Sequence, residues 1–301
     1  MSAGAGCASD RPTPRNADIG SSAAEARPAR DGRDSRESPV SDRHATLRLE
    51  IEGLAPVPLV RTTVGRVPTW MQIDSGASVH TLPGFLVRRA ELAREPRASS
   101  ITIDTWGQLD DGPVAVREQD EDLPGARAGI AGLISPQRLL PEGTVVLDLP
   151  RREMRAASER EAMRALSSHA TELTIAAERC DGMYVVGAFI EGVHARLIID
   201  TGAAATALYA RSRAGAALDA RSVGSRGRSF SVDGAMTTRT VEAAKILVGD
   251  VHAVHDLTLL SGARAPAGDA ARACAEDGVL GIDVLGACVL VFGPGLRIRC
   301  G

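Results

Sequence analysis

The chain has 301 residues, a formal net charge of −3 and 44% hydrophobic residues. This apolar content is enough for one large or two small packed domains, whereas a nearly neutral chain with scattered arginines does not favour nucleic acid as a partner. Aromatic residues make up only 3%. The cores must therefore consist of Val, Leu, Ile and Ala, which suits short buried strands.

Residues 1–44 are rich in Ala, Arg, Asp, Ser, Pro and Gly, and we expect them to form a disordered tail. No apolar run approaches the ~20 residues of a membrane-spanning helix, and the start lacks the apolar stretch of a secretory signal. The sequence A-G-A-G-C ending at Cys7 nevertheless resembles the end of a bacterial lipoprotein signal. The expected location is the cytoplasm for the chain as written, or the cell envelope if the true start lies upstream of Cys7.

Two similar hairpins are predicted, and each ends at an aspartate. The apolar run of residues 58–73 is broken by a glycine and leads to Asp74, and the run of residues 183–199 is broken in the same way and leads to Asp200. Apolar runs bounded by Gly-containing turns are typical of paired strands. Each aspartate is therefore expected where a buried strand ends.

The two aspartates lie in near copies of one motif, I-D-S-G-A at residues 73–77 and I-D-T-G-A at residues 199–203, which are 126 positions apart. At this offset, apolar positions coincide along both hairpins. A second pair of similar segments, residues 129–133 and 278–282, is 149 positions apart. The pattern predicts an internal duplication with extra residues in the second copy.

Between the copies, residues 151–168 have good helix propensity but no clean apolar stripe, so we interpret them as a partly helical linker. Further hairpins with a glycine at the tip are predicted around Gly107 and Gly234. The expected organisation is mostly β, with three parts: a disordered tail over residues 1–44, a first lobe over residues 45–155, and a linker with a second lobe over residues 156–301.

Over about residues 45–301, these motifs resemble the retropepsin-like aspartic peptidases, the fold of retroviral proteases and, in duplicated form, of pepsin. In that family each lobe has an apolar-apolar-Asp-Ser/Thr-Gly turn and a later apolar-Gly segment. The resemblance implies a bilobal acid-protease fold, with two β-barrel lobes and a cleft between them. It also implies an aspartic endopeptidase that hydrolyses peptide bonds in a polypeptide substrate.

The resemblance implies that Asp74 and Asp200 form the catalytic dyad. Two carboxylates in contact cannot both ionise cheaply, so they share one proton, and one acts as base on a water while the other acts as acid. Such a mechanism requires no metal or other cofactor. Because one chain supplies both aspartates, a monomer is expected to hold a complete active site.

Other roles follow from the same resemblance. Hydroxyl bonds to the opposite lobe and close backbone approach to the carboxylates would support the dyad, and the residues implied are Ser75, Gly76, Thr201 and Gly202. The two Gly-tipped hairpins would be flaps over the substrate, with candidate contacts at Trp106, Gly107, Asp233 and Gly234. No tyrosine stands where the flap of pepsin carries one, so the resemblance does not define the subsites.

Other candidate chemistry is weaker. His80 has Thr206 as its counterpart at the offset of 126, so we expect His80 at the surface or in a subsite. His252 and His255 are spaced like a metal pair, but their segment alternates like a strand edge. Four cysteines of the second half allow either two disulfides or unpaired buried thiols, and their spacing does not favour zinc: Cys180, Cys274, Cys288 and Cys300.

Two other classes of function are alternatives to the peptidase. An actin-like ATPase also has two Asp-x-Gly turns, but the short halves and the sequence after Asp74 disfavour it. A bilobal peptide-binding module without turnover is the other alternative, and the sequence leaves it open.

Overall fold

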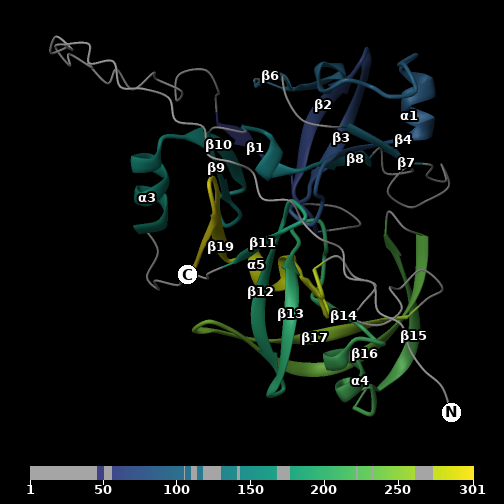
Figure 1. Ribbon diagram of the computed structural model, residues 1–301, viewed down its shortest axis with the longest axis vertical. Helices are drawn as coiled ribbons and strands as arrows, with labels where there is room; N and C mark the ends of the chain where they lie inside the picture. The colour runs from purple at the N-terminus through teal and green to yellow at the C-terminus, as the bar shows by residue number, and fades with distance from the viewer. Residues whose placement is uncertain are drawn as a thin grey trace, which may run out of the picture. The chain divides into compact units, whose positions relative to one another are not determined.

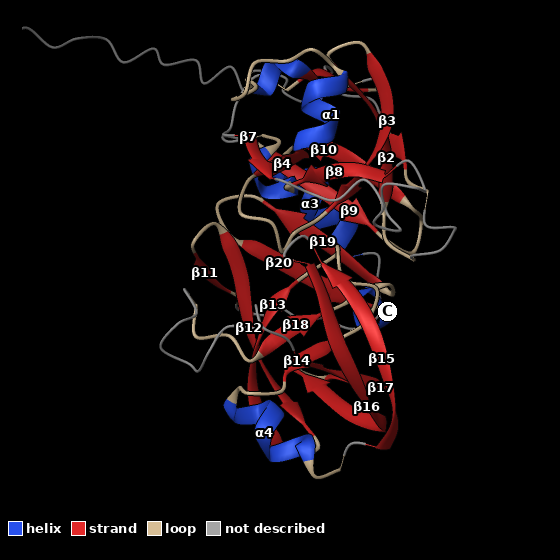
Figure 2. Ribbon diagram, turned by 90° about the vertical axis from the view of Figure 1, so that its right-hand side faces the viewer, coloured by secondary structure: helices blue, strands red, loops and turns tan. Residues whose placement is uncertain are grey.

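The computed structural model describes residues 46–50, 56–104, 106–109, 114–117, 130–140, 143–167, 177–221, 223–231, 234–261 and 274–301. Strands dominate this part of the chain and form three sheets, while the helices are short (Figures 1 and 2). The helices are α1 (Gly84–Arg89), η2 (Ala98–Ser100), η3 (Pro136–Arg138), α3 (Glu159–Ser167), α4 (Arg213–Asp219) and α5 (Ile282–Leu285). The prediction of a mostly β fold is confirmed. The predicted tail, residues 1–44, lies outside the described residues.

The sheet of the first half has seven strands. In spatial order they are β6 (Gly107–Gln108), β5 (Ile101–Ile103), β2 (Leu59–Val64), β3 (Val67–Ile73), β8 (Ile130–Ile134), β4 (His80–Pro83) and β7 (Val114–Arg117). Strands β2 and β3 form the first predicted hairpin, which turns at Gly65 with a φ of 60°. Glycine adopts this left-handed conformation without the cost that a Cβ would bring.

The sheet of the second half has eight strands. In spatial order they are β11 (Glu178–Cys180), β12 (Met183–Ile190), β13 (Val193–Ile199), β18 (Gly278–Leu280), β14 (Ala207–Tyr209), β17 (Val251–Ser261), β16 (Gly234–Val248) and β15 (Val223–Ser231). An additional pairing of β12 with β16 curls this sheet back on itself. Strands β12 and β13 form the second predicted hairpin.

Both sheets have the same arrangement around their aspartates. In the first half, β8 lies parallel to β3 and antiparallel to β4, which is in turn parallel to β7. In the second half, β18 has the same relation to β13 and β14, and β14 is parallel to β17. The strand that ends at each aspartate is therefore held between a hairpin partner and a short parallel strand.

The register of these parallel strands corrects the second sequence offset. Ile73 pairs with Ile134, and its counterpart Ile199 pairs with Leu280. The structural offset of this segment is therefore 146, from Ile134 to Leu280, and not 149 as the spacing of glycines indicated. At the corrected offset, Gln137 is the counterpart of Asp283.

A third sheet combines strands from both ends of the chain. Its order is β1 (Leu47–Arg48), β10 (Glu153–Ala157), β9 (Thr144–Asp148), β19 (Cys288–Phe292) and β20 (Leu296–Cys300). The linker prediction was only partly right, because residues 153–157 form β10 before α3 begins. The lobe boundary predicted at residue 155 falls within this strand.

Helix α3 begins with a reciprocal cap. The Ser158 amide donates to the Glu161 carboxylate at 2.8 Å, and the Glu161 amide donates to the Ser158 hydroxyl at 3.3 Å. The apolar face of the helix packs Ala162, Ala165 and Leu166 against strands of the third sheet. The main hydrophobic core includes buried residues of all three sheets, so burial of apolar surface joins them.

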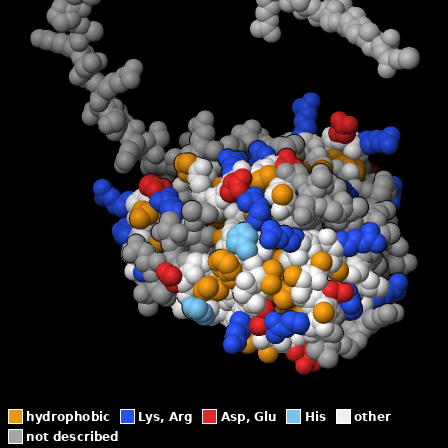
Figure 3. All heavy atoms as spheres, turned by 60° about the horizontal axis from the view of Figure 1, so that its bottom comes forward, with side chains coloured by type: hydrophobic (Ala, Val, Ile, Leu, Met, Phe, Trp, Pro, Cys, Tyr) orange, Lys and Arg blue, Asp and Glu red, His pale blue; other side chains and the backbone are white. Residues whose placement is uncertain are grey.

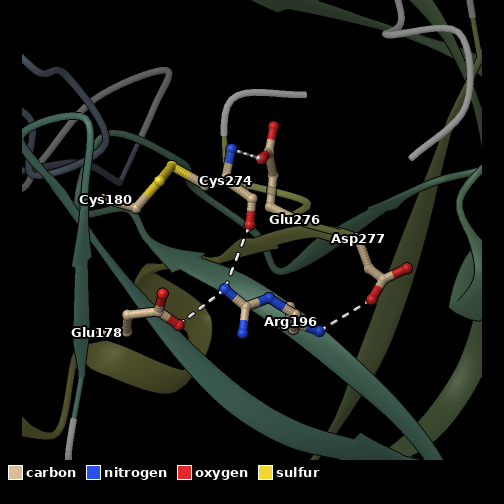
Figure 4. A network of polar contacts seen from close by, with 6 residues as sticks. All are labelled: Glu178, Cys180, Arg196, Cys274, Glu276 and Asp277. Atoms are coloured by element: carbon tan, nitrogen blue, oxygen red, sulfur yellow. Dashed lines mark hydrogen bonds and ion pairs between the residues drawn. A yellow bond between two sulfur atoms is a disulfide. The ribbon is translucent and has the colours of Figure 1, made fainter. Parts of the chain in front are cut away.

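Two disulfides are present in the second half, Cys180–Cys274 and Cys288–Cys300. The first lies in a polar network around Arg196, shown in Figure 4, where the guanidinium donates to Glu178 at 2.9 Å and to the Cys274 carbonyl at 3.3 Å. The Arg196 backbone amide donates to Asp277 at 2.9 Å. The disulfide and this network together fix the segment that leads into β18.

Candidate active site

Asp74 and Asp200 each begin a tight turn at the end of a strand, β3 for the first and β13 for the second. The Asp74 amide donates to the Ile134 carbonyl at 2.8 Å, and the Asp200 amide donates to the Leu280 carbonyl at 3.0 Å. Each turn is thus anchored to the end of the parallel strand beside it. The two halves present their aspartates from equivalent backbone positions.

The structure brings the two carboxyl groups together, and they are hydrogen bonded to each other. Each also accepts a hydrogen bond within its own turn. The Gly76 amide donates to Asp74 Oδ1 at 2.8 Å, and the Gly202 amide donates to Asp200 Oδ1 at 2.8 Å. Charge-assisted bonds of this kind fix the orientation of the carboxyl plane.

Ser75 and Thr201 join the two turns through four hydrogen bonds, and both side chains are fully buried. The Ser75 hydroxyl donates to the Ile199 carbonyl at 2.7 Å and accepts from the Thr201 amide at 3.0 Å. The Thr201 hydroxyl donates to the Ile73 carbonyl at 2.7 Å and accepts from the Ser75 amide at 3.1 Å. These reciprocal buried bonds fix the position of one turn relative to the other.

Each turn glycine lies against the aspartate of the opposite half. A Cβ at Gly76 would lie 2.6 Å from the Asp200 carboxyl carbon, and a Cβ at Gly202 would lie 2.5 Å from that of Asp74. Real Cβ contacts do not come this close. Glycine is therefore required at both positions for the two carboxyl groups to meet.

Burial raises the pKa of both carboxyl groups, because the charged form loses its hydration. The pKa of Asp200 rises well above its usual range, since the neighbouring charge of Asp74 adds to the effect of burial. For Asp74, the hydrogen bond from Asp200 opposes the effect of burial. Asp200 is therefore the member of the pair with the more strongly raised pKa.

Two glutamines that the sequence analysis missed contact these turns. Gln72 donates to the Gly202 carbonyl at 2.7 Å, and Gln137 donates to the carbonyls of Ser75 and Ala77 at 3.2 and 2.9 Å. Gln72 was visible as a polar residue between Met71 and Ile73, where the second half has Ile198. Gln137 was missed because the offset of 149, taken from residues 129–133 and 278–282, does not align it with its structural counterpart Asp283.

The hairpins predicted around Gly107 and Gly234 are present. In the first of them one flap candidate is exposed and another is buried. Gly107 follows the β5–β6 turn with a φ of 83° and is exposed, whereas Trp106 is 7% exposed and packs in the hydrophobic core. Gly234 pairs with Ser231 across the β15–β16 turn. Asp233 lies outside the described residues.

The candidate histidines lie on two strands, His80 on β4 and His252 and His255 on β17. The surface position expected for His80 was wrong: it is fully buried, and its Nδ1 accepts from the Ser135 amide at 3.2 Å. His252 and His255 lie on β17 with odd spacing, so their side chains leave opposite faces of the sheet. Figure 3 shows one molecular face on which histidines lie among hydrophobic and basic side chains.

Among the described residues, no group of three or more His, Cys, Asp or Glu side chains could hold a metal ion. No helix in the same described ranges is long and apolar enough to cross a membrane.

Residues 186–284 match the model of a protein family described as aspartyl protease. The matched segment begins in β12 and ends in α5, so it includes Asp200 and β18. A search of curated proteins gives no match. The family match supports a peptidase-type hydrolase, and it falls on the half that has the more extensive sheet.

Proposed function

We propose that this chain is an aspartic endopeptidase in which Asp74 and Asp200 share one proton and activate a water. The main support is the contact between the two carboxyl groups, which the Ser75 and Thr201 bonds hold across the two halves. The aspartyl protease match over residues 186–284 supports the same reaction class.

In the proposed reaction, ionised Asp74 removes a proton from the water as its oxygen attacks the substrate carbonyl carbon. Asp200 donates its proton to the carbonyl oxygen, which gives a neutral tetrahedral diol. Asp74, now protonated, then donates that proton to the amide nitrogen while ionised Asp200 accepts a proton from a diol hydroxyl. The C–N bond breaks to give a carboxylic acid and an amine, and the two aspartates return to their starting states. The charge assignment follows from the higher pKa of Asp200, which burial and the charge of Asp74 produce.

The substrate we propose is an extended polypeptide. It would lie between the dyad and the two hairpins, β5–β6 with Gly107 and β15–β16 with Asp233 and Gly234. Trp106 would act as the buried base of the first hairpin, since its side chain is in the core. Strand-like binding offers backbone hydrogen bonds along the whole segment.

We further propose that the two halves arose by duplication of one lobe, with the first lobe up to β10 and the second from α3 onward. The equivalent pairing of β3, β8 and β4 with β13, β18 and β14 supports this origin. Because one chain contributes both turns, the proposed active species is a monomer. The nearly neutral net charge leads us to propose no role for nucleic acid.

Cleavage of a diverse peptide mixture between about pH 3 and pH 7, followed by mass spectrometry, tests the proposal. The full chain should cleave, whereas Asp74→Asn and Asp200→Asn should each remove all cuts while remaining folded. Asp250→Asn is the matched control, because Asp250 is exposed in the turn between β16 and β17. Full activity in either dyad variant, or no cuts from the folded parent, would reject the mechanism.

A further inference from the structure

The two glutamines have a common relation to the dyad. Both come from the first half, and each donates to a backbone carbonyl of a catalytic turn: Gln72 to Gly202 and Gln137 to Ser75. A carbonyl and the amide N–H that follows it belong to one planar peptide group. A hydrogen bond to the carbonyl therefore affects the orientation and the donor strength of the N–H in the same peptide group.

In the first turn, Gln137 Nε2 donates to the Ser75 carbonyl at 3.2 Å. The same peptide group carries the Gly76 N–H, which donates to Asp74 Oδ1 at 2.8 Å. One peptide thus lies between the glutamine amide and the carboxylate. Further bonds to the carbonyls of Ala77 and Gly182, at 2.9 and 3.1 Å, fix the position of the Gln137 amide.

In the second turn, Gln72 Nε2 donates to the Gly202 carbonyl at 2.7 Å. The N–H of that peptide belongs to Ala203, and it donates to the Asp200 backbone carbonyl at 3.2 Å. The N–H of Gly202 itself donates to Asp200 Oδ1 at 2.8 Å, so Gln72 holds the residue whose amide orients the carboxylate. Gln72 reaches across from the first half to the second, so it also bridges the two halves.

We propose that Gln72 and Gln137 are positioning residues: Gln137 acts on Asp74 through one intervening peptide group, and Gln72 acts on Asp200 by holding Gly202, whose amide bonds the carboxylate. At Ser75, the hydrogen bond to the carbonyl polarises the peptide, which makes the Gly76 N–H a stronger donor to the carboxylate. The same bond prevents the peptide plane from rotating. Both effects favour the ionised carboxylate and fix its direction. The inference rests on the proposed dyad function.

The fold alone does not explain these glutamines. The second half has Ile198 at the position equivalent to Gln72, so an apolar residue is compatible with this strand. It has Asp283 at the position equivalent to Gln137, and that carboxylate accepts from the amide and hydroxyl of Thr206 instead. The second half therefore supplies no equivalent donor at these two positions.

Gln137 also has an unfavourable feature. Its Oε1 is buried without a hydrogen-bond partner among the described residues, which costs free energy that an apolar side chain would avoid. A group that served only for packing would not require this amide. Its Nε2 donates to three backbone carbonyls, so we infer that the side chain contributes by holding the turn in place.

The test measures proton affinity as well as turnover. Gln72→Ile introduces the residue found at the equivalent position of the second half, and Gln137→Met removes the amide at similar volume. Carbon-13 NMR titration of the aspartate carboxyls, assigned with Asp74→Asn and Asp200→Asn, gives the two midpoints of the pair. Gln72→Ile should raise the upper midpoint and Gln137→Met the lower one, by about half a pH unit each, because each change weakens the amide bond that favours the ionised carboxylate.

Turnover supplies the second readout. Each variant should lower kcat by about tenfold with little change in KM, because substrate contacts are untouched, and the alkaline limb of the Gln72→Ile profile should move upward. Thr62→Val is the control: it removes a donor to the Thr69 carbonyl, far along β3 from Asp74, and should leave both midpoints unchanged.

The outcomes separate this inference from the proposed function. Unchanged midpoints in folded Gln72→Ile and Gln137→Met would overturn the inference even if the parent cleaves peptides. If the parent cleaves nothing, the peptidase proposal fails, and the NMR midpoints still decide whether the glutamines act on the aspartates. If Gln137→Met does not fold, the Gln72→Ile midpoint decides the result.

Discussion

At the scale of single residues, His80 predicts a specific dependence of stability on pH. It is fully buried, and burial together with the nearby Arg138 charge lowers its pKa from 6.5 to about 4. Between these values the unfolded chain binds a proton that the folded chain does not. Stability should therefore fall as the pH decreases from 6.5 to 4, by about 3 kcal/mol, and then level off.

Denaturation with urea at pH 4, 5, 6 and 7 measures this effect, with His80→Thr as the comparison. Threonine is present at the equivalent position 206, where its hydroxyl accepts from the Gly281 amide as His80 accepts from Ser135. The dyad has the opposite sign, since its raised pKa favours the folded state at low pH, but it is common to both proteins. Parallel pH curves for the parent and His80→Thr would contradict the prediction.

At the scale of elements, the two disulfides should differ in what they contribute. Cys180–Cys274 joins residues 94 apart and Cys288–Cys300 joins residues 12 apart. In the chain-entropy model, replacing the first pair by alanine costs about 5 kcal/mol and replacing the second about 3 kcal/mol. Urea unfolding of the two double variants tests the order, and the reverse order would show that native packing outweighs loop closure.

The sequence predicted the hairpins β2–β3 and β12–β13 because apolar runs and turn glycines are local signals. It misaligned the later pair of similar segments by three residues. Gly278 can be matched with either Gly129 or Gly132, and the sequence does not show which glycine lies against another backbone. In the structure Gly132 lies against the Thr81 carbonyl and Gly278 against the Ala207 carbonyl. These contacts between distant strands decide the register.

Strand β10 was missed because its sequence contains Arg, Glu and Ala, which favour helix locally. In the structure it pairs on one side with the preceding strand β9 and on the other with β1, which lies far earlier in the chain. The alternate residues Met154 and Ala156 of β10 are buried in the main hydrophobic core. Strand pairing overrides local propensity here, whereas α3 forms where the sequence predicted a partly helical segment from its helix propensity.

At the scale of the whole molecule, the repeated motif indicated two aspartates in equivalent settings. It did not indicate that the first half supplies both glutamine donors, since Gln72 and Gln137 depart from the repeat. Symmetry could therefore reveal the dyad. The difference between Gln72 and Ile198 is visible at the offset of 126, whereas the difference between Gln137 and Asp283 depends on the register of the parallel strands.

The exchange of bonds between Ser75 and Thr201 within one chain predicts that no second copy is needed for catalysis. Activity per mole should stay constant on dilution. A mixture of Asp74→Asn with Asp200→Asn should remain inactive, because every chain then contains one defective site. If the dyad formed between two chains, mixed dimers would recover about a quarter of the parent activity. Peptide cleavage by the mixture, with parent diluted into either variant as the control, distinguishes the two arrangements.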